Sequence, residues 1–258
     1  MLSFMNAPTK TPLTLLTGAS RGLGLGLAQQ LLARGHRLLT LQRTPNPTLR
    51  AYGPQRVEQW SVDLRDPVPV AQRLSQWLAT QDSQGVSCIS IIHNAALLVE
   101  PGPLSEADVA QVSAATRASL EAPLVLTAAF LKATASWPVP RKVLSISSGL
   151  GRHAMAGSAV YCAVKAGMDH YSRALAMEEA LQPNGAKVVS LAPGIIDTDM
   201  QVQLRSADRD KFPEGARFDS FKSEGRLDSP ESAGAKIVSY LERADFGAQV
   251  IADVRDAA

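Results

Sequence analysis

Short apolar runs alternate with helical patterns along nearly the whole chain, and this alternation constrains the fold more than any other feature. Seven such runs predict strands, at residues 14–17, 37–41, 57–60, 87–92, 142–146, 187–191 and 248–251. Helical patterns separate them, at residues 22–34, 71–78, 158–180 and 229–243, with two helices within 105–135. Strands that alternate with helices are typical of a parallel sheet with helices on both faces. We therefore expect an α/β fold, with one doubly wound domain over residues 1–258.

The composition argues against several classes of protein. Hydrophobic residues make up 45% of the 258 residues and charged residues 19%, values that suit a globular enzyme and not a disordered chain. The net charge is only +2 and the sequence has no dense run of Lys and Arg, so we expect no nucleic-acid partner. No apolar run reaches 18 residues, and residues 1–10 lack the pattern of a signal peptide. These features predict a cytoplasmic protein that does not span a membrane.

Cys88 and Cys162 are the two cysteines of the chain, too few for a disulfide framework or a cluster of metal ligands. We interpret both as small, buried apolar side chains. The sequence therefore predicts no metal site.

A glycine-rich segment follows the first predicted strand. Residues 17–24, ThrGlyAlaSerArgGlyLeuGly, place Gly18, Gly22 and Gly24 where the strand turns into a helix. Glycine lets the backbone approach a pyrophosphate closely, and the amino terminus of the helix stabilises its negative charge. The spacing differs from the general GlyxGlyxxGly fingerprint, and such a turn alone can be purely structural. Its place between a buried strand and a helix favours nucleotide binding.

Tyr161 and Lys165 lie four residues apart in the predicted helix 158–180, so their side chains share one face. An ammonium group beside a phenol favours the phenolate, and we expect the pKa of Tyr161 to fall towards neutrality. Such a phenol can pass a proton to or from a substrate oxygen. The spacing is common by chance, so its weight depends on the motifs around it.

Six motifs in register resemble the short-chain dehydrogenase/reductase family, from about residue 12 to residue 252. They are the glycine segment 17–24, AspLeu (63–64), AsnAlaAla (94–96), IleSerSer (146–148), TyrCysAlaValLys (161–165) and ProGlyIleIleAspThr (193–198). The resemblance implies a Rossmann-type domain with a parallel seven-stranded sheet and a nicotinamide dinucleotide as cofactor. The residues that it implies as cofactor-binding are Gly18, Ser20, Arg21, Gly22, Leu23, Gly24, Arg43, Asp63, Leu64, Asn94, Ala95, Tyr161, Lys165, Pro193, Gly194, Ile196 and Thr198.

The same resemblance implies three catalytic residues, Ser148, Tyr161 and Lys165. The family's serine stands 13 positions before its tyrosine, a distance that selects Ser148 over Ser147. Ser148 is expected to hold a substrate carbonyl, Tyr161 to donate the proton as hydride arrives, and Lys165 to hold the nicotinamide ribose and keep the tyrosine pKa low. We interpret Ser147 as a strand-end hydroxyl bonded to backbone.

Charge near the adenosine ribose predicts which dinucleotide binds. Members of the family that use NAD usually end the second strand with an acidic residue, but residues 41–44 are LeuGlnArgThr. Arg43 beyond this strand and Arg21 in the glycine turn can together bind a 2′-phosphate, although each alone is more often a surface charge. We therefore expect NADP (NADPH) as cofactor and carbonyl reduction as the working direction.

Two positions bear on details of the site. Ser119 stands where many family members carry an active-site asparagine; its hydroxyl can bond backbone or water, or it can be a helix-surface residue. Asp253 lies near the acidic residue that anchors the pterin in sepiapterin reductases, but the register is uncertain by about a residue, so the role of Asp253 stays open.

The substrate prediction is a small ketone or vicinal diketone. Residues 192–201 and 248–253 are similar to sepiapterin reductases and the related benzil reductases within the family. A segment at about 199–226 is expected to form a lid over the substrate. Its larger apolar side chains are expected to line the pocket or to pack against the domain; they are Met200, Phe212, Phe218 and Phe221.

Two other functions fit the same residues. One is an NAD(P)-dependent dehydrogenase of another secondary alcohol, and the other is a non-enzymatic NADP-binding regulator. The helices within 105–135 and 158–180 resemble those that the family uses for assembly, so we expect a homodimer or homotetramer.

Overall fold

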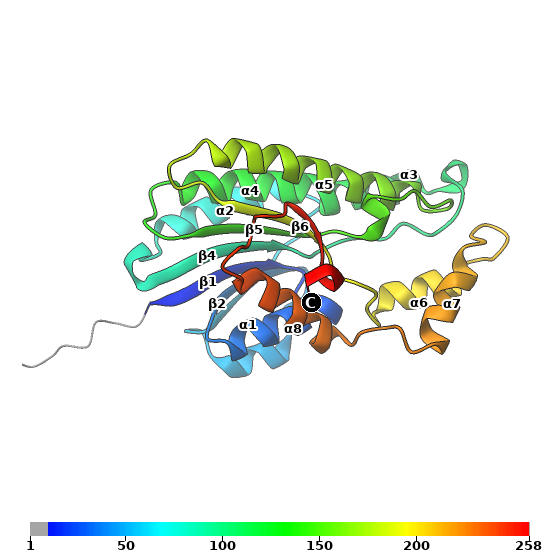
Figure 1. The fold of residues 1–258 in the computed structure, drawn as a ribbon, viewed down its shortest axis with the longest axis horizontal. Coiled ribbons are helices and arrows are strands. Elements are labelled where there is room, and N and C mark those ends of the chain that lie inside the picture. The colour runs from blue at the N-terminus through cyan, green and yellow to red at the C-terminus, as the bar shows by residue number, and fades with distance from the viewer. Residues whose placement is uncertain (1–9, 258) are drawn as a thin grey trace, which may run out of the picture.

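The computed structural model describes residues 10–257. Within them, seven parallel strands form one sheet in the order β3-β2-β1-β4-β5-β6-β7 (Figure 1). The strands are β1 (Thr11–Thr17), β2 (Arg37–Gln42), β3 (Val57–Ser61), β4 (Val86–His93), β5 (Arg141–Ile146), β6 (Lys187–Ala192) and β7 (Ile251–Asp253). The doubly wound α/β fold is therefore confirmed. Residues 1–9 and 258 of the predicted domain lie outside the described residues.

Helices cover both faces of the sheet, as Figure 1 shows. The helices α1 (Gly22–Ala33) and α8 (Pro230–Glu242) lie on one face. The opposite face carries α2 (Pro67–Ala79), α4 (Ala122–Ala133) and α5 (Ala159–Ala180), with α3 (Val109–Thr116) beside α5. Two short helices, α6 (Asp199–Ser206) and α7 (Gly215–Ser223), project beyond the carboxyl ends of the strands.

Alternate residues of the strands build two separate cores. Leu13 and Leu15 of β1 pack towards α2 and α4, whereas Leu16 packs towards α1 and α8. All three side chains are at most 1% exposed. Near-continuous apolar strands are what a sheet buried on both faces requires.

The structure changes several boundaries. The last strand is Ile251–Asp253 and not 248–251, because residues after the left-handed Gly247 first form a turn in which Ala248 N–H donates to Asp245 O. The two helices within 105–135 join through a π-helical turn, Arg117–Glu121. Both cysteines are half-buried, so their interpretation as fully buried apolar residues was wrong.

The helices α1 and α8 approach each other at two glycines. A Cβ atom on Gly26 would lie 2.2 Å from the carbonyl oxygen of Pro230, and one on Gly234 would lie 2.8 Å from the carbonyl carbon of Gly26. The backbones of the two helices are therefore in direct contact, with no room for a side chain between them.

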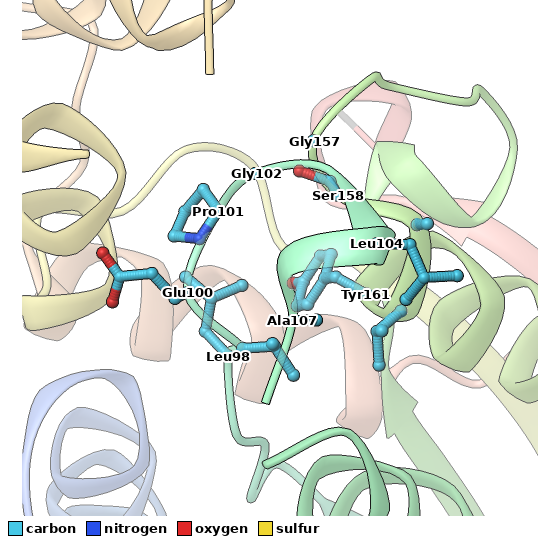
Figure 2. Close-up of a pocket in the computed structure, with 12 residues that line it drawn as sticks. Leu98, Glu100, Pro101, Gly102, Leu104, Ala107, Gly157, Ser158 and Tyr161 are labelled. Atoms are coloured by element: carbon cyan, nitrogen blue, oxygen red, sulfur yellow. The ribbon is translucent and has the colours of Figure 1, made fainter. Parts of the chain in front are cut away.

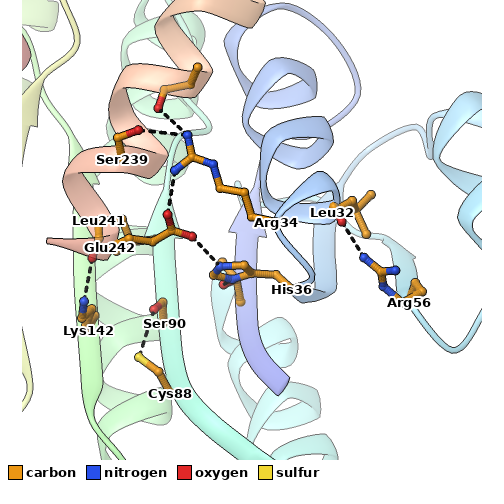
Figure 3. A network of polar contacts seen from close by, with 12 residues as sticks. Leu32, Arg34, His36, Arg56, Cys88, Ser90, Lys142, Ser239, Leu241 and Glu242 are labelled. Carbon is orange, nitrogen blue, oxygen red and sulfur yellow. Dashed lines mark hydrogen bonds and ion pairs between the residues drawn. The ribbon is translucent and has the colours of Figure 1, made fainter. Parts of the chain in front are cut away.

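A polar network fastens the other end of α1 to α8 (Figure 3). Arg34 Nη1 donates to Glu242 Oε2 at 2.7 Å, and Arg34 Nη2 donates to Ser239 Oγ at 2.9 Å. His36 Nε2 lies 3.2 Å from Glu242 Oε1, and its other ring nitrogen lies 2.9 Å from Thr14 Oγ1. The network ties α8 to the start of β2 and to β1.

The glycine contact predicts a large effect of one methyl group. We expect Gly26→Ala to lower the free energy of unfolding by about 1–3 kcal/mol, because α8 must move away, even though alanine favours a helix over glycine by about 1 kcal/mol. Urea denaturation measures the change. Gly149→Ala is the control, since a Cβ there meets nothing within 4 Å. Equal stability of Gly26→Ala and the wild type would contradict direct backbone contact.

Candidate active site

Four of the predicted motifs meet at one edge of the sheet. Gly18, Asn94, Ser148 and Pro193 come directly after or within two residues of the ends of β1, β4, β5 and β6. These strands are neighbours in the sheet and all run in parallel, so their carboxyl ends lie side by side. Ligands of open α/β sheets bind in the crevice beyond these ends.

The glycine turn is closed against the loop after β4. Gly18 has a φ of +75°, and a Cβ on it would lie 2.9 Å from Ala95 Cα. A Cβ on Gly24 would lie 1.8 Å from Gly18 O and 2.6 Å from Asn94 Nδ2. The Asn94 amide donates to Thr17 O at 3.1 Å and to Gly18 O at 3.0 Å. Only glycine fits at positions 18 and 24.

The start of α1 suits a bound pyrophosphate. The helix begins at Gly22, and the side chain of its N-cap residue Arg21 makes no capping bond to the first amides. Free amides at a helix amino terminus, together with the helix dipole, form an anion site. These residues fit the dinucleotide that the sequence predicts.

Thr17 is a functional residue that the sequence reasoning did not select. Its Oγ1 accepts the N–H of Asn94 and the N–H of Ala95, both at 3.0 Å, and the side chain is 3% exposed. Thr17 therefore joins the ends of β1 and β4 under the glycine turn. The available signal was a hydroxyl residue at the last position of a buried strand.

The other residues predicted to bind the cofactor differ in their burial and in their hydrogen bonds. Ser20 and Leu23 lie in and after the turn, half-buried, and Ser20 O accepts a bond from Asn46 Nδ2 at 2.8 Å. Leu64 is 8% exposed and packs in the core. The Asp63 carboxylate accepts from Arg65 Nε at 2.8 Å, and the hydrogen bonds from Arg65 hold the pKa of Asp63 below its usual value.

The loop after β6 reaches back to the glycine turn. Gly194 has a φ of +82°, and Ile196 forms an isolated bridge with Asp228. A Cβ on Gly22 would lie 3.4 Å from Thr198 Cγ2. The predicted loop residues Pro193, Gly194, Ile196 and Thr198 therefore run from the sheet edge to the turn.

Arg21 forms an ion pair that the sequence analysis did not predict. Arg21 Nη1 lies 2.7 Å from Asp199 Oδ2, and the two side chains are 75% and 70% exposed. Asp199 begins α6 directly after Thr198, which explains why it reaches the turn. Arg43 is exposed at the end of β2. An ion pair this exposed is weak, so Arg21 is readily released.

The three predicted catalytic residues do converge. Tyr161 and Lys165 lie one turn apart in α5, with Lys165 Nζ 5.6 Å from the centroid of the tyrosine ring. The hydroxyl of Ser148 lies near the Tyr161 phenol and acts to lower the pKa of Tyr161. Ser148 Oγ also accepts the N–H of Leu150 at 3.2 Å. Lys165 Nζ donates to Ile146 O at 2.7 Å.

We expected the pKa of Tyr161 to fall towards neutrality. For the protein without cofactor, this prediction was wrong. Burial raises the pKa of Tyr161 to about 12, against a smaller lowering by the nearby hydroxyl of Ser148. Burial also lowers the pKa of Lys165 to about 8, which the carboxylate of Asp169 partly opposes. The spacing of Tyr161 and Lys165 in the sequence indicated a charge beside the phenol. It did not indicate the loss of water around both groups on burial, and this desolvation is the largest cause of both pKa shifts.

Two serines differ from their predicted surroundings. Ser147 Oγ donates to the carboxylate of Asp169 and not to backbone. Ser119 lies in the π-helical turn and is 1% exposed, so it is not a helix-surface residue. Its Oγ accepts the N–H of Leu97 at 2.9 Å, the backbone bond that was the other expectation. Short π-helical segments are frequent at functional sites.

A small pocket lies beside Tyr161 (Figure 2). Its walls come from two segments, residues 98–107 and residues 157–161. Gly102 N–H donates to Gly157 O at 2.9 Å and holds the two segments together. The free volume is about 20 Å³, room for about one water molecule. The segment 98–107 was missed because no motif marks it in the sequence.

The aromatic residues of the lid pack on one another. Phe212 and Phe218 stack with ring centroids 5.8 Å apart, and Phe221 contacts Phe218 edge-on at 5.8 Å. Met200 packs against this cluster. Leu98, Met155 and Ile195 of the domain also pack against it, so of the two expectations packing against the domain holds, and none of the four lines the pocket beside Tyr161.

Asp253 ends β7 and pairs in register with Ala192 of β6, close to the edge that holds the site. Its carboxylate accepts from Arg255 Nε at 2.8 Å and from Arg255 Nη2 at 2.6 Å. These bonds hold the pKa of Asp253 below its usual value. The carboxylate is thus engaged by its own neighbour in sequence.

Residues 10–257 contain no group of three His, Cys, Asp or Glu side chains that could hold a metal ion. In the same part of the chain, the helices are too short or too polar to cross a membrane.

Comparisons with known proteins agree with this geometry. The short chain dehydrogenase family matches residues 12–209. The chain is 33% identical to benzil reductase ((S)-benzoin forming) of Bacillus cereus, over 90% of this chain and 94% of that protein. It is also 33% identical to sepiapterin reductase of Meriones unguiculatus, over 93% and 95%.

Among solved structures, the KRED1-Pglu enzyme superposes with a TM-score of 0.79 at 26% identity, over 93% of this chain and 99% of that one. The fold, the glycine turn and the Ser148–Tyr161–Lys165 group thus occur together in a chain that matches this family over most of its length. The chain belongs to the short-chain dehydrogenase/reductase family of NAD(P)-dependent oxidoreductases.

Proposed function

We propose that the protein is an NADPH-dependent carbonyl reductase that acts on a small ketone or vicinal diketone. The observation that carries the proposal is the Tyr161 phenol, which lies beside Ser148 and lines an apolar pocket at the carboxyl edge of the sheet. A protonated phenol in such a place is suited to donate a proton to a carbonyl oxygen.

Each catalytic side chain has a separate role in this reaction. The bound dinucleotide supplies the hydride. Ser148 donates a hydrogen bond to the carbonyl oxygen and stabilises the charge that develops there. Tyr161 keeps its proton at neutral pH because burial raises its pKa, and it gives that proton to the oxygen. The ammonium of Lys165 then stabilises the tyrosinate that remains.

The pocket walls support a neutral, largely apolar substrate. Most of the wall side chains are apolar, and they include Leu98, Pro101, Leu104, Ala107 and Val160. Glu100 is the charged residue of the wall, and it is exposed. The names of two relatives, benzil reductase and sepiapterin reductase, support a dicarbonyl or ketone substrate. Admission of such a molecule requires the pocket to open.

The charged residues at the end of β2 and in the glycine turn support a preference for NADPH. Strand β2 ends in Gln42, with no carboxylate to accept bonds from the ribose. Arg43 follows it, exposed, and Arg21 is held only by an exposed ion pair with Asp199. Arg43 is therefore accessible to a 2′-phosphate, and Arg21 can bind one once its exposed ion pair with Asp199 breaks.

We further propose that the protein acts in the cytoplasm as a homodimer or homotetramer. An apolar groove between α3 and α5 supports assembly through these helices. Its apolar side chains are Leu104, Val112, Leu120, Val160 and Val164.

Removal of the phenolic hydroxyl tests the reaction. With NADPH and benzil, Tyr161→Phe is expected to lower kcat/KM about 10²–10⁴-fold, because the proton donor is lost. Tyr171→Phe is the matched control on the same helix and is expected to keep wild-type turnover. Near-normal turnover by Tyr161→Phe would remove Tyr161 as donor. Turnover of sugars or acyl-carrier substrates alone would overturn the proposed substrate class.

The cofactor preference is tested by charge removal at the end of β2. Arg43→Ala is expected to lower kcat/KM for NADPH at least about tenfold, the size of one lost charge-assisted bond of about 1.4 kcal/mol, and to leave NADH unaffected. Arg50→Ala, an exposed arginine in the following turn, serves as control. Equal efficiency of the wild type with NADPH and NADH would contradict the preference.

The raised pKa predicts how Tyr161 titrates without cofactor. An ordinary tyrosine is half ionised at about pH 10, whereas Tyr161 is expected to keep its proton there. Tyrosinate ultraviolet absorbance of the wild type and of Tyr161→Phe should therefore coincide from neutral pH up to about pH 10. A wild-type excess near neutral pH would show that Lys165 outweighs burial.

A further inference from the structure

Asp169 is a buried acid that the catalytic steps above do not use. It lies in α5, one turn beyond Lys165, and is 1% exposed. Its Oδ1 accepts the hydroxyl of Ser147 at 2.5 Å and the hydroxyl of Ser190 at 2.6 Å. A buried carboxylate is costly unless donors surround it, so these bonds account for its presence.

The two serines connect Asp169 to the ends of the central strands. Ser147 directly follows β5 and precedes Ser148, and its N–H donates to Leu191 O of β6 at 2.8 Å. Ser190 lies in β6 itself. Consecutive Cα atoms are about 3.8 Å apart, so the tether on Ser147 restricts where the hydroxyl of Ser148 can lie.

The turn after Ser148 also contacts the carboxylate of Asp169. Arg152 Nε lies 3.3 Å from Asp169 Oδ2, and Arg152 Nη2 donates to Ala252 O of β7 at 2.7 Å. A Cβ on Gly151 would lie 3.0 Å from Asp169 Oδ2 and 2.9 Å from Lys165 O. The carboxylate therefore has donors on both oxygens and a close backbone neighbour.

The charges that face Asp169 come from several elements. Lys165 lies on its own helix, and Arg152 approaches from the turn after Ser148. Beyond Arg152 stands the Asp253–Arg255 pair at the end of β7. Ser147 and Ser190 contribute neutral hydroxyls from β5 and β6. Asp169 thus connects the helix that carries Tyr161 to the strand end that carries Ser148.

We propose that Asp169 is a positioning residue that holds Ser148 beside Tyr161 through Ser147, Ser190 and Arg152. The proposal rests on the proposed catalytic roles of Ser148 and Tyr161. Misplacement of a reacting group by about 1 Å can cost about 10²-fold in rate, so loss of this anchor affects turnover more than binding. Asp169 itself does not touch the substrate.

A double-mutant cycle tests the proposal. Asp169→Ala and Ser147→Ala are each expected to lower kcat at least about tenfold, with KM and the Kd for NADPH changed less than about twofold. The double variant is expected to lose no more than the larger single loss, because both changes break one connection. Ser145→Ala is the matched control: Ser145 is a fully buried serine of β5 whose hydroxyl has no hydrogen-bond partner.

A second measurement does not depend on turnover. Hydrogen exchange in peptides that cover residues 146–153 is expected to speed up in Asp169→Ala and in Ser147→Ala, but not in Ser145→Ala. If Asp169→Ala does not fold, the variant with both Ser147→Ala and Ser190→Ala removes the same bonds and keeps the carboxylate.

The outcomes separate the two proposals. Unchanged kcat in folded Asp169→Ala, additive losses in the cycle, or unchanged exchange at residues 146–153 would each overturn the positioning role. Absence of carbonyl turnover in the wild type would overturn the proposed function, and hydrogen exchange would then decide whether Asp169 orders this turn.

Discussion

Parallel pairing of β1, β4, β5 and β6 is the constraint on which the site depends. It places the ends of these strands next to one another, so segments up to 175 residues apart in sequence, Gly18 and Pro193, meet at one edge. Backbone contacts that only glycine allows then hold this edge together, and so do the hydrogen bonds of Asn94 and Thr17. The order of the strands in the sheet therefore positions the glycine turn and α5, and the loop after β4 holds the turn closed.

Burial and charge act against each other in the catalytic group. Desolvation raises the pKa of Tyr161 and lowers that of Lys165, which favours the neutral form of each side chain. A neutral phenol is the form that donates a proton, so burial suits Tyr161 to the proposed carbonyl reduction. In that proposal the charge of Lys165 stabilises the tyrosinate after the proton has left, and the nearby carboxylate of Asp169 helps to keep Lys165 charged.

The sequence allowed the fold and the convergence of Ser148, Tyr161 and Lys165 to be predicted because both follow from local signals. Alternating apolar runs identify strands, and fixed spacings relate Ser148 to Tyr161 and Tyr161 to Lys165. The roles of Thr17 and Asp169 depend on contacts between distant segments that no local pattern reveals. The pKa of Tyr161 likewise depends on how completely the folded chain excludes water, which residue spacing does not report.

The pocket beside Tyr161 also depends on tertiary contacts, and its tightness limits how it can open. Phe212 is fully buried and sits against Gly157, where a Cβ would lie 2.7 Å from its ring. Phe212 is also stacked on Phe218, so it is part of the aromatic cluster of the lid. Movement of Phe212 alone would leave a cavity in that cluster, and such a cavity is costly. Displacement of the whole cluster keeps its internal contacts intact, so the lid is expected to move as one packed unit when a carbonyl substrate enters.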